Sequence, residues 1–181
     1  QLICHEYFHA WNVVRMKPRA LAPPDLAREH PTRLLWFFEG FTAYYEDLLL
    51  RRAGLVDDAQ YLRLLAGPLN RVQGTPGRHV QSVAEASFDA WVKFYKRDEN
   101  TANATVSYYD KGALVALLAD LSLRQQGRSL DEVMRALWQR SGGGPIDEAD
   151  IDAAFGSPFA ATLRTWVDQP GEDRKSTRLN S

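Results

Sequence analysis

The chain has 181 residues, 45% of them hydrophobic, which is enough to bury one sizeable core. Its formal net charge of −1 provides none of the basic surface that nucleic-acid binding requires. No apolar run approaches the roughly 18–20 residues of a membrane-spanning helix. We therefore expect neither a nucleic-acid partner nor a membrane partner. The single cysteine, Cys4, excludes a disulfide within the chain.

The first predicted helix, residues 2–15, begins with a His-Glu-x-x-His motif at residues 5–9. Residues four apart lie on one face of a helix, so the imidazoles of His5 and His9 converge on one point. Zinc accepts imidazole nitrogen at about 2.0–2.1 Å. Glu6 lies further round the helix, where it is better placed to hold a water molecule than to bind the same ion. The motif predicts one Zn²⁺ per chain, with Glu6 as the general base.

A catalytic zinc takes three protein ligands and keeps one position for water. The irregular segment 17–32 contains His30, and His79 follows a predicted turn; both are candidates, but both resemble ordinary loop histidines. Glu39 has WFF before it and GF after it. A carboxylate among large apolar residues loses its hydration, and this loss is costly unless the carboxylate is paired or binds a cation. We therefore expect Glu39 to be the third ligand, on a second helix that ends at Gly54.

The middle of the chain is also predicted to be helical. Asp57 can cap a third helix that runs to about Val72, before a turn at residues 74–77. Residues 79–95 are ambiguous. Their first part favours a short helix, whereas their last part, residues 91–95, alternates weakly like a strand but could also extend a helix.

The C-terminal half continues the helical pattern with a long amphipathic helix over residues 105–126 that stops at Gly127. A capping-box sequence begins the next helix, which we expect at residues 129–140. Asp147 and Ser157 introduce two more short helices. The sequence shows no internal repeat and no second folded domain, so we expect a mainly α bundle.

Three segments carry a family resemblance: residues 5–15, 39–45 and 106–114. A His-Glu-x-x-His pair followed by a ligand glutamate is similar to the gluzincin metallopeptidases. The residues around the three segments narrow this to a resemblance to the bacterial glycyl aminopeptidase family, over residues 1–168. The resemblance implies the helical half of a thermolysin-like zinc metallopeptidase catalytic domain. It also implies a β-rich part before that half and a PDZ domain after it in the parent protein. Residues 169–181 are expected to form a disordered or non-native tail.

The third segment supplies a candidate for oxyanion stabilisation. In related aminopeptidases, the tyrosine of a Tyr-x-Lys-Gly motif donates a hydrogen bond to the developing oxyanion. That register selects Tyr109 here, with Tyr108 as the alternative. Metal-bound histidines also need an outer partner to orient the ring. Glu46 is the first candidate because it lies on the same helical face as Glu39; Asp47 and Asn12 follow.

Three functions remain open from the sequence. The first is a zinc-dependent aminopeptidase that hydrolyses N-terminal peptide bonds through zinc-activated water. The second is a zinc endopeptidase or other metallohydrolase. The third is a non-catalytic zinc-binding remnant, and the presence of Glu6 argues against this third function. The resemblance implies peptide substrates with small N-terminal residues such as glycine or alanine, and a bacterial cytoplasm or periplasm. Because the β-rich part is absent, turnover by the isolated chain is not expected.

Overall fold

The computed structural model describes residues 1–23, 25, 27–96 and 98–171. This part of the chain folds into helices, and no strand occurs in it apart from two isolated β-bridges. The mainly α prediction is therefore confirmed. The helices are α1 (Leu2–His9), α2 (Leu35–Phe38), α3 (Gly40–Arg52), α4 (Asp58–Gly74), α5 (Val83–Phe88), α6 (Thr101–Ala104), α7 (Tyr108–Gln125), α8 (Leu130–Ser141), α9 (Glu148–Phe155) and α10 (Ser157–Asp168), with shorter turns η1 (Arg19–Leu21), η2 (Pro76–His79) and η3 (Ala90–Phe94).

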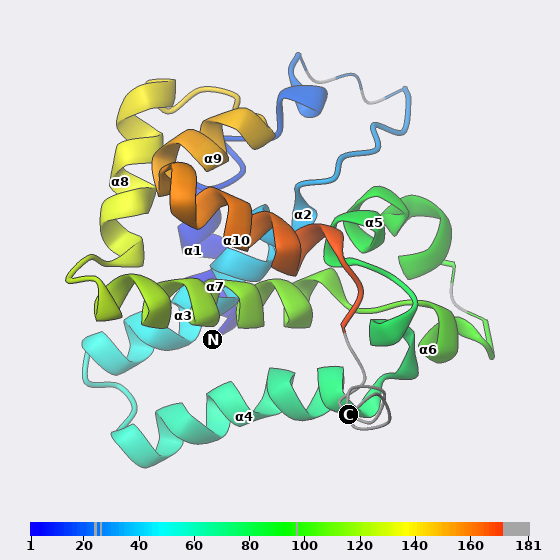
Figure 1. Cartoon of the computed structure of the whole chain (residues 1–181), viewed down its shortest axis with the longest axis horizontal. Coiled ribbons are helices and arrows are strands. Elements are labelled where there is room, and N and C mark those ends of the chain that lie inside the picture. Colours follow the sequence, from blue (N-terminus) through cyan, green and yellow to red (C-terminus); the bar gives the residue numbers. More distant parts are fainter. Residues whose placement is uncertain (24, 26, 97, 172–181) are drawn as a thin grey trace, which may run out of the picture.

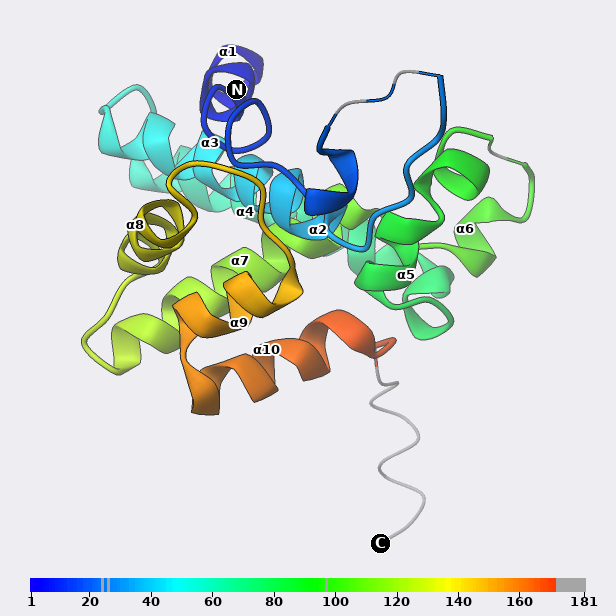
Figure 2. The same ribbon diagram turned by 90° about the horizontal axis from the view of Figure 1, so that it is seen from above.

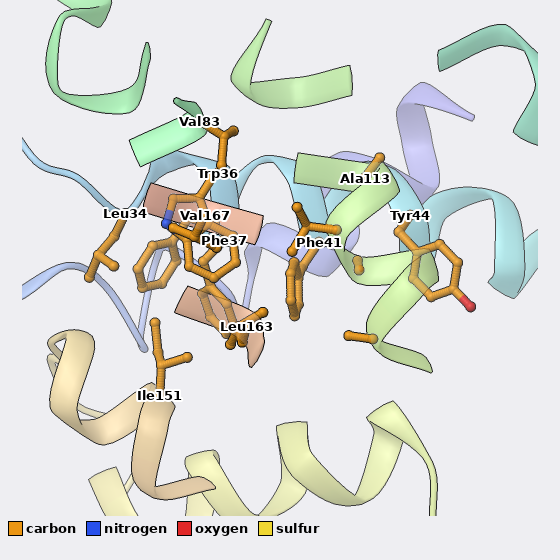
Figure 3. Close-up of a cluster of buried hydrophobic side chains, with 14 of the residues drawn as sticks. Leu34, Trp36, Phe37, Phe41, Tyr44, Val83, Ala113, Ile151, Leu163 and Val167 are labelled. Carbon is orange, nitrogen blue, oxygen red and sulfur yellow. The ribbon is translucent and has the colours of Figure 1, made fainter. Parts of the chain in front are cut away.

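Helix α7 is the central element of the bundle and packs against α2, α3, α4, α5, α8 and α10 (Figure 1). In the second view, α1 lies beyond α3 on one side of the bundle, and α9 and α10 lie beyond α7 on the other side (Figure 2). The core between these layers is aromatic on the α2–α3 side, where Trp36, Phe37 and Phe41 are fully buried. Leu163 and Val167 of α10 approach the same cluster (Figure 3).

Several helix ends follow the expected capping chemistry. Asp57, Ser82, Ser129 and Asp147 each accept a hydrogen bond from the backbone three residues later, and the residue at that position returns the bond. Gly54 follows α3 with a φ of +71°, a conformation that glycine adopts without steric cost. These local signals explain why the helix ends predicted at these residues lie close to the observed ones.

The predicted first helix was too long, because α1 ends at His9 instead of Arg15. After His9 the chain turns back, and Val13 has a φ of +144°. The Asn12 side chain is buried and donates hydrogen bonds to the Phe38 carbonyl and the Thr42 hydroxyl. These tertiary hydrogen bonds fix the turn against α2 and α3.

Two other segments differ from the sequence-based expectation. The second helix is divided at Glu39 into α2 and α3. The strand alternative for residues 91–95 is wrong, since Ala90–Phe94 forms the π-helical turn η3. Within the described residues, no helix is both long enough and apolar enough to cross a membrane. Most of the predicted tail, residues 172–181, lies outside the described part.

Candidate metal centre

His5 and His9 project from one face of α1, as the spacing of the motif requires. Their ring centroids are 4.6 Å apart and the ring planes are almost perpendicular. Both side chains are mostly buried, although no residue of α1 counts as buried when its backbone is included. The two Nε2 atoms approach the same carboxylate oxygen, Glu39 Oε2, which is 3.4 Å from His5 and 3.2 Å from His9.

Glu39 lies at the junction of α2 and α3, where the chain interrupts one helix and begins the next. The residues on either side of it, Phe38 and Gly40, are buried. This junction places the carboxylate opposite the histidine face of α1, which packs against α3. One nitrogen or oxygen atom from each of His5, His9 and Glu39 lies within 4.8 Å of the other two. We call these three residues the metal cluster.

The metal cluster fits a tetrahedral zinc ion. Two ligand atoms at about 2.0–2.1 Å from zinc, at tetrahedral angles, are separated by roughly 3.3–3.4 Å. The observed nitrogen–oxygen distances of 3.4 and 3.2 Å match that edge length. Two imidazoles and one carboxylate also form the donor set of catalytic zinc sites, which keep a fourth position for water. These residues would hold the ion without a large rearrangement.

The other ring nitrogen of each histidine is already held. His5 Nδ1 donates to Glu46 Oε2 at 2.6 Å, and His9 Nδ1 donates to the Asn12 carbonyl at 2.9 Å. Because the acceptors occupy Nδ1, each neutral ring presents the lone pair of Nε2 to the cluster. Outer partners of this kind fix the tautomer and the orientation of metal-binding histidines.

The electrostatics of the metal cluster favour a positive charge between the three side chains. Hydrogen bonds to Glu39 and Glu46 raise the pKa of His5 to about 9. Burial alone would lower the pKa of His9, yet the hydrogen bond to Glu39 raises it. Burial alone would raise the pKa of Glu39, but the two histidines lower it to about 2. The raised pKa values favour protonated imidazoles beside Glu39. A bound divalent cation would take the place of the protons on the two Nε2 atoms.

Tyr109 extends from the first turn of α7 toward the same cluster. Its ring lies 6.4 Å from the His5 ring, and it is only partly buried. Burial and the charge of Glu39 raise the pKa of Tyr109, so its hydroxyl stays protonated and can donate a hydrogen bond at neutral pH. Tyr108 stacks on Tyr109 with ring centroids 4.8 Å apart, but it is completely buried.

The family model for the M61 glycyl aminopeptidases matches residues 1–115, which include the metal cluster and both tyrosines. The chain belongs to the M61 glycyl aminopeptidase family. It is therefore a member of a peptidase family whose members are generally metallopeptidases.

A solved structure supports this M61 assignment. The chain is similar to the crystal structure of an aminopeptidase N family protein from Idiomarina loihiensis, with 41% sequence identity and a TM-score of 0.89. The match covers 98% of the chain and 32% of the other protein, so the chain spans about a third of the length of that structure. No curated protein sequence matches the chain.

The other residues of this M61 chain that the sequence offers as metal ligands or as partners of the histidines lie outside the metal cluster. His30 Nε2 donates to the Asp25 carbonyl, and His79 Nδ1 donates to the Gly171 carbonyl; neither histidine joins the metal cluster. Asp47 accepts a hydrogen bond from Gln1 and does not contact the cluster histidines.

Glu6 lies one residue beyond His5 on α1, and its side chain is exposed. Asn12 contacts His9 through its backbone carbonyl, whereas its side chain holds the turn after α1. Sequence patterns carry no signal for a carbonyl contact of this kind, because any residue could supply it.

Proposed function

We propose that this chain is the zinc-binding catalytic part of an aminopeptidase that removes N-terminal residues from peptides. The convergence of His5, His9 and Glu39, with both Nδ1 atoms already engaged, is the observation that carries the proposal. The donor set supports zinc as the metal. The family description, glycyl aminopeptidase, supports cleavage after an N-terminal glycine.

When bound, zinc would acidify a water molecule and polarise the carbonyl group of the scissile peptide bond. Glu6 is exposed beside His5, so its carboxylate is free to take a proton from the attacking water and return it to the leaving amine. Tyr109 donates a hydrogen bond to the carbonyl oxygen as negative charge develops there. Glu46 and the Asn12 carbonyl keep the two imidazoles oriented throughout the reaction.

We further propose that the parent enzyme contains the β-rich part and the PDZ domain expected from the family resemblance. No residue of α1 is buried, and several large apolar residues of the segment are strongly exposed: Leu2, Ile3, Tyr7, Trp11 and Val14. Several large apolar residues exposed within one short segment are typical of a surface that another part of a protein covers. Full activity would then require the parent enzyme.

The decisive experiment uses the protein expressed from its complete reading frame. Metal analysis should find one zinc per chain in the wild type and in Glu6→Gln. Turnover of glycyl- and alanyl-arylamides should fall by about 10²–10⁴-fold in Glu6→Gln, as expected for the loss of a general base. Unchanged turnover in this variant would remove Glu6 from the mechanism, and a wild type without zinc would contradict the metal assignment.

The same preparation separates the alternative functions. An aminopeptidase needs a free substrate amine, so N-acetylated peptides should not be cleaved. Cleavage of acetylated peptides within the chain would indicate an endopeptidase. Stoichiometric zinc with no hydrolysis of any peptide would indicate a non-catalytic zinc-binding protein.

A further inference from the structure

A large open groove lies between α4 and α6, beside the first turn of α7 (Figure 1). Its volume is about 710 Å³, which falls within the range of roughly 300–1,000 Å³ that ligand pockets occupy. Its walls include Arg71 of α4, Ala102 of α6 and Asp110 of α7. None of the three metal-cluster residues lines it, so the groove is separate from the metal cluster and needs its own explanation.

The rings of Phe94 and Tyr109 connect the groove to the metal cluster. Phe94 lines the groove, and its ring centroid lies 5.9 Å from that of Tyr109. The Tyr109 ring in turn lies 6.4 Å from the His5 ring. An extended peptide advances by about 3.3–3.6 Å per residue, so two steps of this size correspond to roughly three or four residues. A peptide whose scissile carbonyl group lies beside Tyr109 can therefore reach the groove with the third or fourth residue beyond the scissile bond.

The proposed reaction determines which end of the peptide can occupy the groove. An aminopeptidase cleaves after the first residue of its substrate, so only one residue lies on the N-terminal side of the scissile bond. A site that is three or four residues away from that bond must hold the C-terminal side, which is the part that leaves after cleavage.

The walls of the groove offer hydrogen-bond acceptors to the N–H groups of a peptide. The Thr75 hydroxyl donates to the Arg71 carbonyl, and the Thr105 hydroxyl donates to the Thr101 carbonyl. Each hydroxyl has used its single donor in this way and keeps oxygen lone pairs that can accept a further bond. Both threonines line the groove and are only partly buried, so a bound peptide can reach them.

An ion pair holds two walls of the groove together. The Arg71 guanidinium donates to both carboxylate oxygens of Asp110 at 2.8–3.1 Å and so joins the end of α4 to the first turn of α7. Bonds of this charge-assisted type are stronger than neutral ones. The groove is therefore formed before a ligand binds, and little ordering of the protein opposes binding.

We propose that this groove binds the part of a peptide substrate that lies C-terminal to the scissile bond. The enzyme then acts better on peptides of about five or more residues than on tripeptides, because only the longer substrates reach the groove. This inference rests on the proposed aminopeptidase function and refines its substrate class to oligopeptides.

The length dependence is tested with zinc-loaded protein expressed from the complete reading frame. The substrates are peptide amides that carry an N-terminal glycine followed by two, three, four or five alanines, so that their charge is the same. Between the tripeptide and the pentapeptide, kcat/KM should rise by about two- to tenfold, the range expected for one neutral hydrogen bond. A wild type whose kcat/KM does not change with peptide length would overturn the proposal.

A substitution that fills the groove shows whether the groove causes this rise. Ala102 and Asn103 are both exposed on α6, but only Ala102 lines the groove. Ala102→Trp should abolish the rise and leave turnover of the tripeptide and of a glycyl-arylamide unchanged. Asn103→Trp is the matched control and should keep the wild-type rise. An equal rise in the two variants, or an equal loss in both, would contradict the assignment of the groove.

Calorimetric binding of the same peptides to zinc-loaded Glu6→Gln provides a readout that does not depend on turnover. Tighter binding of the pentapeptide than of the tripeptide, lost in the double variant Glu6→Gln/Ala102→Trp, supports the groove even if the wild type hydrolyses no peptide. If the wild type hydrolyses glycyl-arylamides and Glu6→Gln does not, the proposed function stands. If Ala102→Trp then keeps the full length dependence of the wild type, the groove inference is overturned on its own.

Discussion

Gly40 and Gly112 bring α3 and α7 into direct backbone contact. A Cβ atom on Gly40 would overlap the Gly112 Cα atom, and a Cβ atom on Gly112 would overlap the Trp36 carbonyl oxygen. Glu39 immediately precedes the first glycine, and Tyr109 lies one helical turn before the second. The contact therefore fixes the separation of the two helices at the level where the candidate ligand and the candidate oxyanion donor originate.

Gly112→Ala should destabilise the chain by about 2–4 kcal/mol, because the added methyl group meets backbone atoms that cannot move aside independently. Chemical denaturation followed by circular dichroism measures the change. Gly74→Ala is the control, since Gly74 is also a helical glycine but an added Cβ there meets nothing within 4 Å. The control should be neutral or slightly stabilising. Equal stability of the two variants would show that the glycine contact is not required.

Zinc affinity should depend on Glu39 and Glu46 to different degrees. Glu39→Gln removes a candidate ligand and should weaken zinc binding by more than the roughly 10–100-fold expected for Glu46→Gln, which loses only the partner of His5 Nδ1. Competition with a chelator measures both values. Asp47→Asn is a matched control because this neighbouring buried residue bonds to Gln1 instead of a cluster histidine. A loss of zinc affinity in the control similar to that in Glu46→Gln would contradict the role given to Glu46.

Tyr109→Phe should reduce kcat by about 10²–10³-fold while zinc stays bound, because it removes one hydrogen-bond donor to the developing oxyanion. Tyr108→Phe should retain kcat on a glycyl substrate. The Tyr109 ring approaches His5, whereas Tyr108 is completely buried. The opposite pattern of kcat values would transfer the catalytic role to Tyr108, the alternative that the sequence leaves open.

The convergence of the metal cluster could be predicted from the sequence because short-range rules determine most of it. The spacing of His5 and His9 is a property of any helix, and the apolar neighbours of Glu39 make an unpaired carboxylate there costly. Glu46 follows from helical periodicity, since it lies two turns after Glu39. These inferences need no knowledge of how distant segments pack.

The features that the sequence did not reveal depend on tertiary contacts. The early end of α1 is fixed by bonds from the Asn12 side chain to residues of α2 and α3. The interruption of the second helix at Glu39 coincides with the close approach of α7 at Gly112. No local propensity encodes either event, because both require a partner segment that is distant in the sequence.

A buried charged network joins α3, α7 and α8 away from the metal cluster. The Asp120 carboxylate accepts hydrogen bonds from the Tyr44 hydroxyl at 2.8 Å, from Arg124 Nε at 2.9 Å and from the Leu130 amide at 2.9 Å. Asp120→Ala would leave the buried tyrosine hydroxyl and the backbone amide without their acceptor. We expect a loss of about 3 kcal/mol in the free energy of unfolding, measured by urea denaturation near neutral pH.

The Asp120 network should also weaken in acid. Burial alone would raise the pKa of Asp120, but the bonds from Leu130, Arg124 and Tyr44 lower it below its ordinary value of 3.8. Because the folded state favours the ionised form, the stabilisation is complete above about pH 4 and is lost as the pH falls through the folded-state pKa. The stability difference between wild type and Asp120→Asn should therefore shrink as the pH is lowered from about 5 to about 2. The control is Asp58→Asn, at a fully exposed position, which should leave stability nearly unchanged near neutral pH. If the stability difference between wild type and Asp120→Asn stays constant down to the lowest pH, the Asp120 charge does not hold these helices together.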